Sequence, residues 1–222
     1  MTDRPIIFSG PMVRALLERR KTMTRRILKP QPEPFLIDGK ECDVSLIHTE
    51  GDPLPRVALG RVLTKQEVRF VPGDRLYVRE NFAHVGTCDP GFLVFQATYP
   101  DDLPPEMENV PATLREAGYR WTPSIHMPRA LSRLTLIVTG VKVERLNDIS
   151  LSDVYAEGCE VRQMWLFGSD AAARQKIGAR VFSGLWEEIH GVGAWAGNPF
   201  VVAVSFRVIR ANIDSAEVRL AA

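Results

Sequence analysis

A basic segment near the N-terminus combines residue types that can activate a nucleophile. Residues 14–29 hold seven Lys or Arg side chains and one acid, Glu18, in a chain whose net charge is only +1. Within this segment Lys21 is followed by Thr22 and Thr24. A Lys whose pKa is lowered by burial or by neighbouring cations can take the proton of a Thr hydroxyl, which makes that hydroxyl a nucleophile. The segment therefore indicates this chemistry, a phosphate-binding or nucleic-acid-facing patch, or a solvated helix end that leads into an exposed strand.

The backbone conformation of residues 21–26 decides which of these side chains can meet. We expect an extended segment, because Thr and Met at these positions favour a strand over a helix. Side chains alternate along a regular strand, which places Thr22, Thr24 and Arg26 on one face and the alternate residues, beginning with Lys21, on the other. A Lys amine and a Thr hydroxyl that must meet would therefore need a bend between the preceding helix and the strand.

The elements around this segment are expected to be short and mixed in type. A strand at residues 5–8 leads to a helix that begins after Ser9, has Pro11 near its first turn and ends near residues 19–20. Further strands are predicted at 75–79, 93–98, 134–146 and 200–209, and further helices at 150–158 and 169–190. Five or six strands with about three helices in this order predict an α+β fold with a small, mostly antiparallel sheet or barrel.

The two later helices carry clear boundary signals. Ser150 and Asp153 form a start that resembles a capping box, and Gly158 follows as the C′ residue. Gly191 ends the helix at 169–190. The apolar residues that recur every fourth position in that helix, and that we expect on its buried face, are Ile177, Val181, Leu185 and Ile189.

Composition excludes several classes of protein. The chain has 222 residues, 45% hydrophobic and 25% charged, with 28 Lys and Arg against 27 Asp and Glu. These values are typical of a soluble globular domain, and the charge balance argues against a histone-like polyanion binder. Three separated cysteines without a CxxC pair disfavour a disulfide framework and structural zinc, and the four histidines lack paired metal spacing, so we expect neither metal nor cofactor. No apolar stretch approaches the ~18 residues of a membrane span, so we expect a cytoplasmic protein without a membrane partner.

Several strings in fixed order carry a family resemblance. They are KTMTRR at 21–26, PGDRLYVRE at 72–80, WTPSIHMPRALSRLTL at 121–136, SDVYAEG at 152–158, LWEEIHG at 185–191 and NPFVVAVSF at 198–206. Together they resemble the ASCH domain family, in particular its phage- and prophage-encoded branch. The resemblance implies a PUA-like fold, a small β-barrel flanked by helices, as a single domain over residues 1–210 with a tail at 211–222. It also implies insertions at about 31–70, 83–119 and 160–180, and a phage-infected or prophage-carrying bacterial cell as the location.

The resemblance also implies roles for particular residues. The chain is similar in its KTxTxR motif to bacterial family members that remove the acetyl group from N4-acetylcytidine. By this similarity Lys21 would act as base, Thr24 as nucleophile on the acyl carbon, and Glu157, with Glu160 as the alternative, would orient Lys21. Arg26 would hold a phosphate or the developing oxyanion, with Thr22 beside it in the substrate site. Other ASCH members are ribonucleases or RNA binders, so non-catalytic binding of RNA or single-stranded nucleic acid and metal-independent RNA cleavage stay open as alternatives.

Further candidates for the substrate site lie later in the chain. Glu80 is either a second acid of the site or a strand-end charge paired with Arg79 or a distant Arg. In the Pro-flanked segment near residue 121, Trp121 would stack on a base while Ser124 or His126 reads its edge. The alternative is a loop held in place by its own aromatic side chain. We expect a nucleoside, a nucleotide or RNA as the partner, and the sequence leaves the oligomeric state open.

Overall fold

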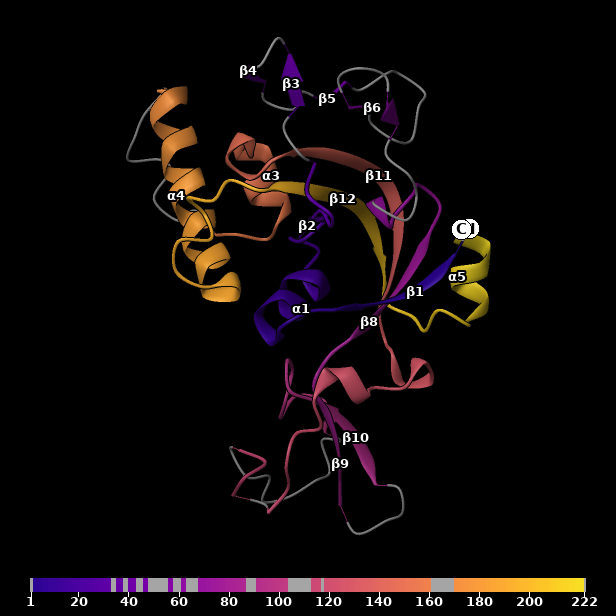
Figure 1. The fold of residues 1–222 in the computed structure, drawn as a ribbon. Helices are drawn as coiled ribbons and strands as arrows, with labels where there is room; N and C mark the ends of the chain where they lie inside the picture. The colour runs from indigo at the N-terminus through magenta and orange to yellow at the C-terminus, as the bar shows by residue number, and fades with distance from the viewer. Residues whose placement is uncertain are drawn as a thin grey trace. The chain divides into compact units, whose positions relative to one another are not determined.

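A computed structural model of the chain describes residues 2–32, 35–37, 40–42, 46–47, 56–57, 61–62, 68–86, 91–103, 113–116, 118–160 and 170–221 (Figure 1). Its strands are β1 Asp3–Ile7, β2 Met23–Ile27, β3 Phe35–Ile37, β4 Lys40–Cys42, β5 Leu46–Ile47, β6 Arg56–Val57, β7 Arg61–Val62, β8 Arg75–Arg79, β9 Phe82–Val85, β10 Phe92–Phe95, β11 Thr135–Arg145 and β12 Phe200–Ile209. Its α-helices are α1 Gly10–Leu17, α3 Leu151–Ala156, α4 Ala171–His190 and α5 Ala216–Ala221. Short 3₁₀ helices are η1 Ser124–His126, η2 Arg129–Leu131 and η3 Leu146–Asp148.

The central sheet has five strands in the order β1-β8-β11-β12-β2. β1 runs parallel to β8, whereas β8 with β11 and β12 with β2 are antiparallel, so the sheet is mixed. The α+β prediction is confirmed. The prediction of a closed barrel is wrong for the described strands, because β1 and β2 end the strand order and are not paired with each other.

The chain divides into two compact units, each assembled from separate segments. Unit 1 comprises residues 1–19, 74–137 and 208–222, and unit 2 comprises residues 20–73 and 138–207. β11 and β12 run through both units. The single domain over residues 1–210 stays a prediction.

Unit 1 has several apolar clusters. One lies around the hairpin of β9 and β10 and includes Val85, Val94 and Leu114. Another contains Ile213 and Val218, which are fully buried, so the segment predicted as a tail contributes to the core of this unit.

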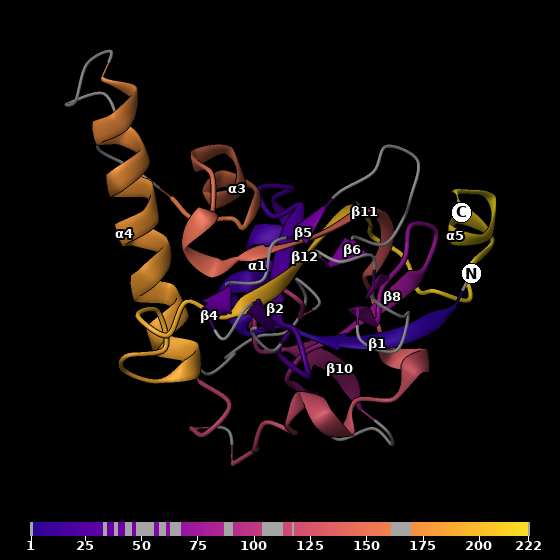
Figure 2. The same cartoon turned by 45° about the horizontal axis from the view of Figure 1, so that its top comes forward.

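Unit 2 has its core between α3, α4 and the strands. Ser150 caps α3 by accepting a hydrogen bond from the Asp153 N–H at 3.1 Å, and Gly158 follows the helix with a φ of 86°. Both boundary signals of this helix are therefore confirmed. Figures 1 and 2 show α4 lying beside α3.

The predicted buried face of α4 is correct only in part. Val181 and Ile189 are 37% and 49% exposed, while the row one residue later, Gly178, Phe182 and Trp186, is buried. Both rows have a spacing of four. The larger aromatic side chains of the second row fill the cluster with Leu146 and Ile149, and Leu185 of the aliphatic row, partly buried, packs against it.

One of the predicted insertions contains two short sheets. Within residues 31–70 the described residues form the two-stranded sheet β3-β4 and the three-stranded sheet β5-β6-β7. None of the described helices is long and apolar enough to cross a membrane.

Candidate functional site

Lys21 and Glu157 meet in unit 2 through both backbone and side chain. Lys21 precedes β2 and forms an antiparallel bridge with Glu157, the C-cap residue of α3. The Lys21 Nζ donates to the main-chain oxygen of Glu157 at 2.9 Å and to its Oε2 at 2.7 Å. The two residues are 0% and 5% exposed. The structure thus joins two of the three residues expected to be catalytic.

Arg25 contacts the other oxygen of the same carboxylate. Its Nη1 lies 3.3 Å from Glu157 Oε1 and 3.4 Å from the sulfur of Met23. Lys21, Met23 and Arg25 therefore face the same side of the chain, as the alternation predicts. Burial would lower the pKa of Arg25, but the charges of Glu157 and Glu144 outweigh it and hold that pKa above its ordinary value.

Further charged side chains surround Arg25. The guanidinium donates to Glu144 Oε1 from Nε at 3.1 Å and from Nη2 at 2.5 Å, and Nη2 also lies 2.6 Å from Asp153 Oδ2. Lys142 Nζ contacts Asp153 Oδ2 at 2.7 Å and Glu144 Oε2 at 3.0 Å. We call this set the charge cluster: Lys21, Arg25, Lys142, Glu144, Asp153 and Glu157. Three cations face three carboxylates, so its formal charge is zero.

The pKa values in the outer part of the charge cluster favour the charged forms. Burial raises the pKa of Asp153, but the hydrogen bond from Lys142 and the charge of Arg25 outweigh it, and the net shift is downward. Burial lowers the pKa of Lys142, but hydrogen bonds to Asp153 and Glu144 outweigh it, and the net shift is upward. Nearby, burial followed by the charge of Glu157 raises the pKa of the Cys159 thiol to about 11, which keeps this thiol protonated at neutral pH.

The two threonines of the motif have different environments. Thr24 is 4% exposed and lies opposite Val204 of β12, and alternation along β2 turns its side chain away from the side of Met23 and Arg25. Thr22 is exposed, and its backbone N–H donates to Ala156 O at 2.8 Å. The backbone of residues 21 and 22 is thus bonded to the end of α3, and the backbone of β2 that follows is paired with β12. This change of partner lies at the junction between helix and strand where a bend was expected.

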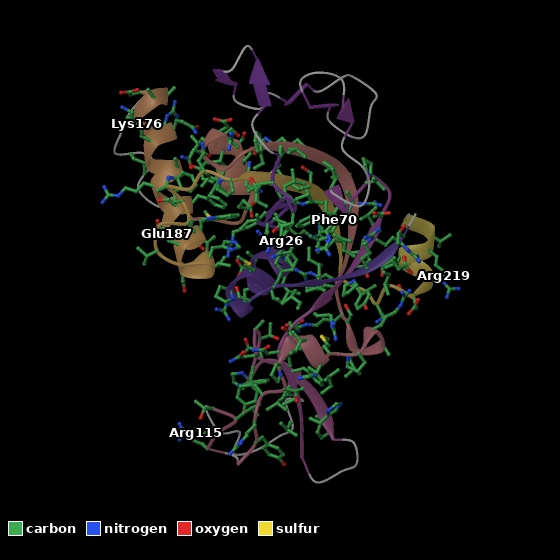
Figure 3. All side chains as sticks on the ribbon, viewed as in Figure 1. Arg26, Phe70, Arg115, Lys176, Glu187 and Arg219 are labelled. Carbon is green, nitrogen blue, oxygen red and sulfur yellow. The ribbon has the colours of Figure 1, made fainter. Side chains whose placement is uncertain are left out.

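Arg26 lies on the other face of β2, near the C-terminal end of α4 (Figure 3). Burial lowers the pKa of Arg26, and the charge of Glu157 opposes that shift. Burial also lowers the pKa of His190, and the positive charges of Arg26 and Lys29 lower it further. The His190 ring lies against Trp186 with 4.1 Å between the ring centroids. Arg26 therefore contributes positive potential at the end of α4.

Glu80 lies in unit 1 and is paired with a distant arginine. Arg133 donates to both of its carboxylate oxygens, from Nε at 2.9 Å and from Nη2 at 3.0 Å. Arg133 also contacts Asp102 at 3.1 Å and lies 3.9 Å above the Phe95 ring. Burial raises the pKa of Glu80, and the hydrogen bonds from Arg133 oppose that shift. This geometry matches the ion-paired alternative for Glu80.

The segment with Trp121 also belongs to unit 1. Trp121 is half-buried, packs against the cluster of Val85 and Leu114, and meets the Tyr99 ring edge-on with 5.7 Å between centroids. Ser124 begins η1, and its backbone N–H donates to Asn81 Oδ1 at 2.8 Å. His126 is exposed. The contacts of Trp121 match a loop held in place by its aromatic side chain.

The predicted site residues thus fall into two groups. Lys21, Thr22, Thr24, Arg26 and Glu157 lie in unit 2, whereas Glu80, Trp121, Ser124 and His126 lie in unit 1.

Sequence reasoning missed four members of the charge cluster: Arg25, Lys142, Glu144 and Asp153. Asp153 and Glu157 are four apart at a helix end, which places them on one face. Lys142 and Glu144 are two apart on a strand, which does the same. These spacings were available signals, but nothing in the sequence connects them to Arg25.

Among the described residues, no group of three or more His, Cys, Asp or Glu side chains is arranged to hold a metal ion. Comparison with protein-family models, curated proteins and solved structures finds no match to the chain.

Proposed function

We propose that the protein hydrolyses the acyl-amide bond of an N4-acylcytidine-like nucleoside, with Lys21 and Glu157 in its active site. The observation that carries the proposal is the buried 2.7 Å contact between these two side chains. Buried ion pairs are often no more stable than apolar residues of similar volume, so stability alone does not account for one. Buried ionisable groups with a specific partner are typical of catalytic sites.

The proposed reaction consumes one water. Lys21 first gives a proton to Glu157 Oε2 and, now neutral, accepts the hydroxyl proton of Thr24 as Thr24 Oγ1 attacks the acyl carbon. This step requires the Thr24 side chain, which alternation turns to the other face of β2, to move to the side of Lys21. The bond between that carbon and N4 breaks, and N4 leaves with the proton from Lys21. Water then cleaves the Thr24 ester: its hydroxyl group goes to the acyl carbon, which leaves as a carboxylic acid, and its other proton returns to Thr24 Oγ1. Glu157 returns its proton to Lys21, which restores the ion pair.

Cytidine release tests the proposal. Purified protein is incubated with N4-acetylcytidine and a panel of other acylated nucleosides, and products are separated by chromatography. We expect turnover by the unmodified protein and its loss in Lys21→Met and Glu157→Gln. Glu160→Gln is the matched control, because Glu160 is a nearby exposed acid that pairs with Arg20 at 3.6 Å. Absence of turnover on the whole panel, or equal loss in Glu160→Gln, would contradict the proposal.

Thr24 needs its own variant. Thr24 lies on the opposite face of β2 from Arg25, so its role as nucleophile does not follow from the contact between Lys21 and Glu157 and is tested separately. Thr24→Val keeps the shape and removes the hydroxyl. We expect loss of the acyl-enzyme and of turnover, while turnover equal to that of the unmodified protein would assign the nucleophile to another group.

A second candidate function is nucleic-acid binding without chemistry. It is favoured by the exposed cations Arg20 and Lys29, which come before and after the buried Lys21 in the chain. Binding through phosphates weakens steeply with salt. A labelled single-stranded RNA is therefore titrated at about 50 and 200 mM salt, in chelator, and checked for cleavage. Binding that is absent or insensitive to salt would exclude this candidate.

A further inference from the structure

We infer that Arg25 is a positioning residue of this site, which holds Glu157 Oε1 so that Oε2 faces Lys21. The inference rests on the proposed function for its kinetic consequence. Its structural part concerns the orientation of one carboxylate and can be measured independently of any reaction.

The two oxygens of Glu157 have different cationic partners. Lys21 Nζ lies 2.7 Å from Oε2, and Arg25 Nη1 lies 3.3 Å from Oε1. The Arg25 and Glu157 side chains are 0% and 4% exposed, so water does not compete for these contacts. Rotation of the carboxylate out of its plane would weaken both contacts together, so the two cations fix the orientation of that plane toward Lys21.

Arg25 is itself held on its other edge. Its Nη2 contacts Glu144 at 2.5 Å and Asp153 at 2.6 Å, and its guanidinium carbon lies 5.8 Å from the Phe182 ring centroid. These partners come from β11, α3 and α4. A planar guanidinium can bind three carboxylates in fixed directions, whereas a Lys ammonium is a single point charge. Arg25 therefore transmits the geometry of three elements to Glu157.

The charge cluster contains a second cation, whose removal changes the charge of the cluster without removing a contact to Glu157. Lys142 binds Glu144 and Asp153, as Arg25 does, but its side chain is 39% exposed and lies at the outer end of the charge cluster. Removal of either cation leaves three carboxylates against two cations. Only removal of Arg25 also removes the contact with Glu157 Oε1.

Kinetics of Arg25→Met, Arg25→Lys and Lys142→Met test the inference. Misplacement of a catalytic group by ~1 Å costs about 10²-fold in rate. We expect kcat to fall by this order in Arg25→Met, with a much smaller change in KM, and the pH–rate profile of the residual activity to shift. Arg25→Lys should recover only part of kcat, and Lys142→Met should change kcat less than either. A folded Arg25→Met with the kcat and pH profile of the unmodified protein, or an equal loss in Lys142→Met, would overturn the inference.

A nuclear magnetic resonance readout keeps this inference separate from the proposed function. The buried ammonium of Lys21 is shielded from solvent exchange, so we expect a resolved ¹⁵N signal that is absent in Lys21→Arg. Arg25→Met and Arg25→Lys should shift or broaden this signal. Arg145→Met should not, because Arg145 is an arginine of β11 outside the charge cluster that lies 3.9 Å above the Phe200 ring. An unmoved signal in Arg25→Lys overturns the inference even where Arg25→Met fails to fold. If the unmodified protein is inactive but the Lys21 signal shifts in the Arg25 variants, only the proposed function is refuted.

Discussion

Lys21 and Glu157 lie 136 positions apart in the chain, and they are joined twice, by an antiparallel backbone bridge and by a 2.7 Å ion pair. The backbone bridge attaches the start of β2 to the C-terminal end of α3. The side-chain pair then lies over the bridge, shielded from water. Because the same two residues carry both contacts, loss of one charge leaves the other buried at a point where the backbone cannot easily move away.

The first prediction concerns the stability of this pair. Removal of one partner of a buried ion pair costs about 3–5 kcal/mol, because the remaining charge is uncompensated, whereas replacement of both by apolar residues is often neutral. We expect Lys21→Met and Glu157→Leu to lower the free energy of unfolding in this range, and the double variant to lose less than either single variant. Urea unfolding of all four proteins gives the coupling free energy. Additive losses would mean that the pair makes no net contribution.

Local patterns predicted much of the fold, and distant pairings set the rest. β8 at Arg75–Arg79 and β12 at Phe200–Ile209 match their predicted bounds, because alternation or a continuous apolar run is a signal within one element. The face of α4 was predicted only in part, because two rows with the same spacing compete, and only the neighbouring core selects Phe182 and Trp186.

The site shows the same division between local and distant information. Alternation predicted the shared face of Lys21 and Arg25. The carboxylate partners of Arg25 lie 119, 128 and 132 positions away, and no period in the sequence encodes such a pairing. The partner of Glu80, Arg133, lies 53 positions away, so its identity also came only from the structure.

The second prediction concerns the loss of folding stability at low pH that protonation of Asp153 causes. Its pKa in the folded state lies below the ordinary value of 3.8, because Lys142 and Arg25 outweigh the effect of burial. A carboxyl with a depressed pKa stabilises the fold above its unfolded pKa, and this contribution is lost as the pH falls through the folded pKa. We expect the urea concentration at the midpoint of unfolding to decrease as the pH is lowered below about 4. Asp153→Asn should be less stable than the unmodified protein at pH 7, and its stability should change less with pH in the acid range. The same loss of stability with falling pH in both proteins would show that Asp153 is not the responsible group.

The third prediction tests the proximity of Arg26 to His190. Burial and the charges of Arg26 and Lys29 lower the pKa of His190 below its ordinary value of 6.5. A histidine with a depressed pKa reduces stability as the pH falls through its unfolded pKa, because folding then opposes protonation. We expect the His190 ring signal in nuclear magnetic resonance to titrate below 6.5 and its midpoint to rise in Arg26→Met. The matched control Arg20→Met should leave it unchanged, and a midpoint that does not respond to Arg26→Met would contradict this geometry.

The fourth prediction uses two glycines of α4 that differ only in their surroundings. A glycine inside a helix is less stable than alanine by about 0.5–1 kcal/mol, because it loses more backbone entropy on folding. A Cβ at Gly184 would meet nothing within 4 Å, so Gly184→Ala should gain stability of this size. A Cβ at Gly178 would lie 2.7 Å from Leu151 Cδ1 and 3.7 Å from Val154 Cγ2, both on α3. Leu151 must then rotate and part of the contact between the helices is lost, so Gly178→Ala should be less stable than Gly184→Ala. Thermal and urea unfolding of both variants measures the difference, and an equal gain at the two positions would show that α3 does not approach α4 at Gly178.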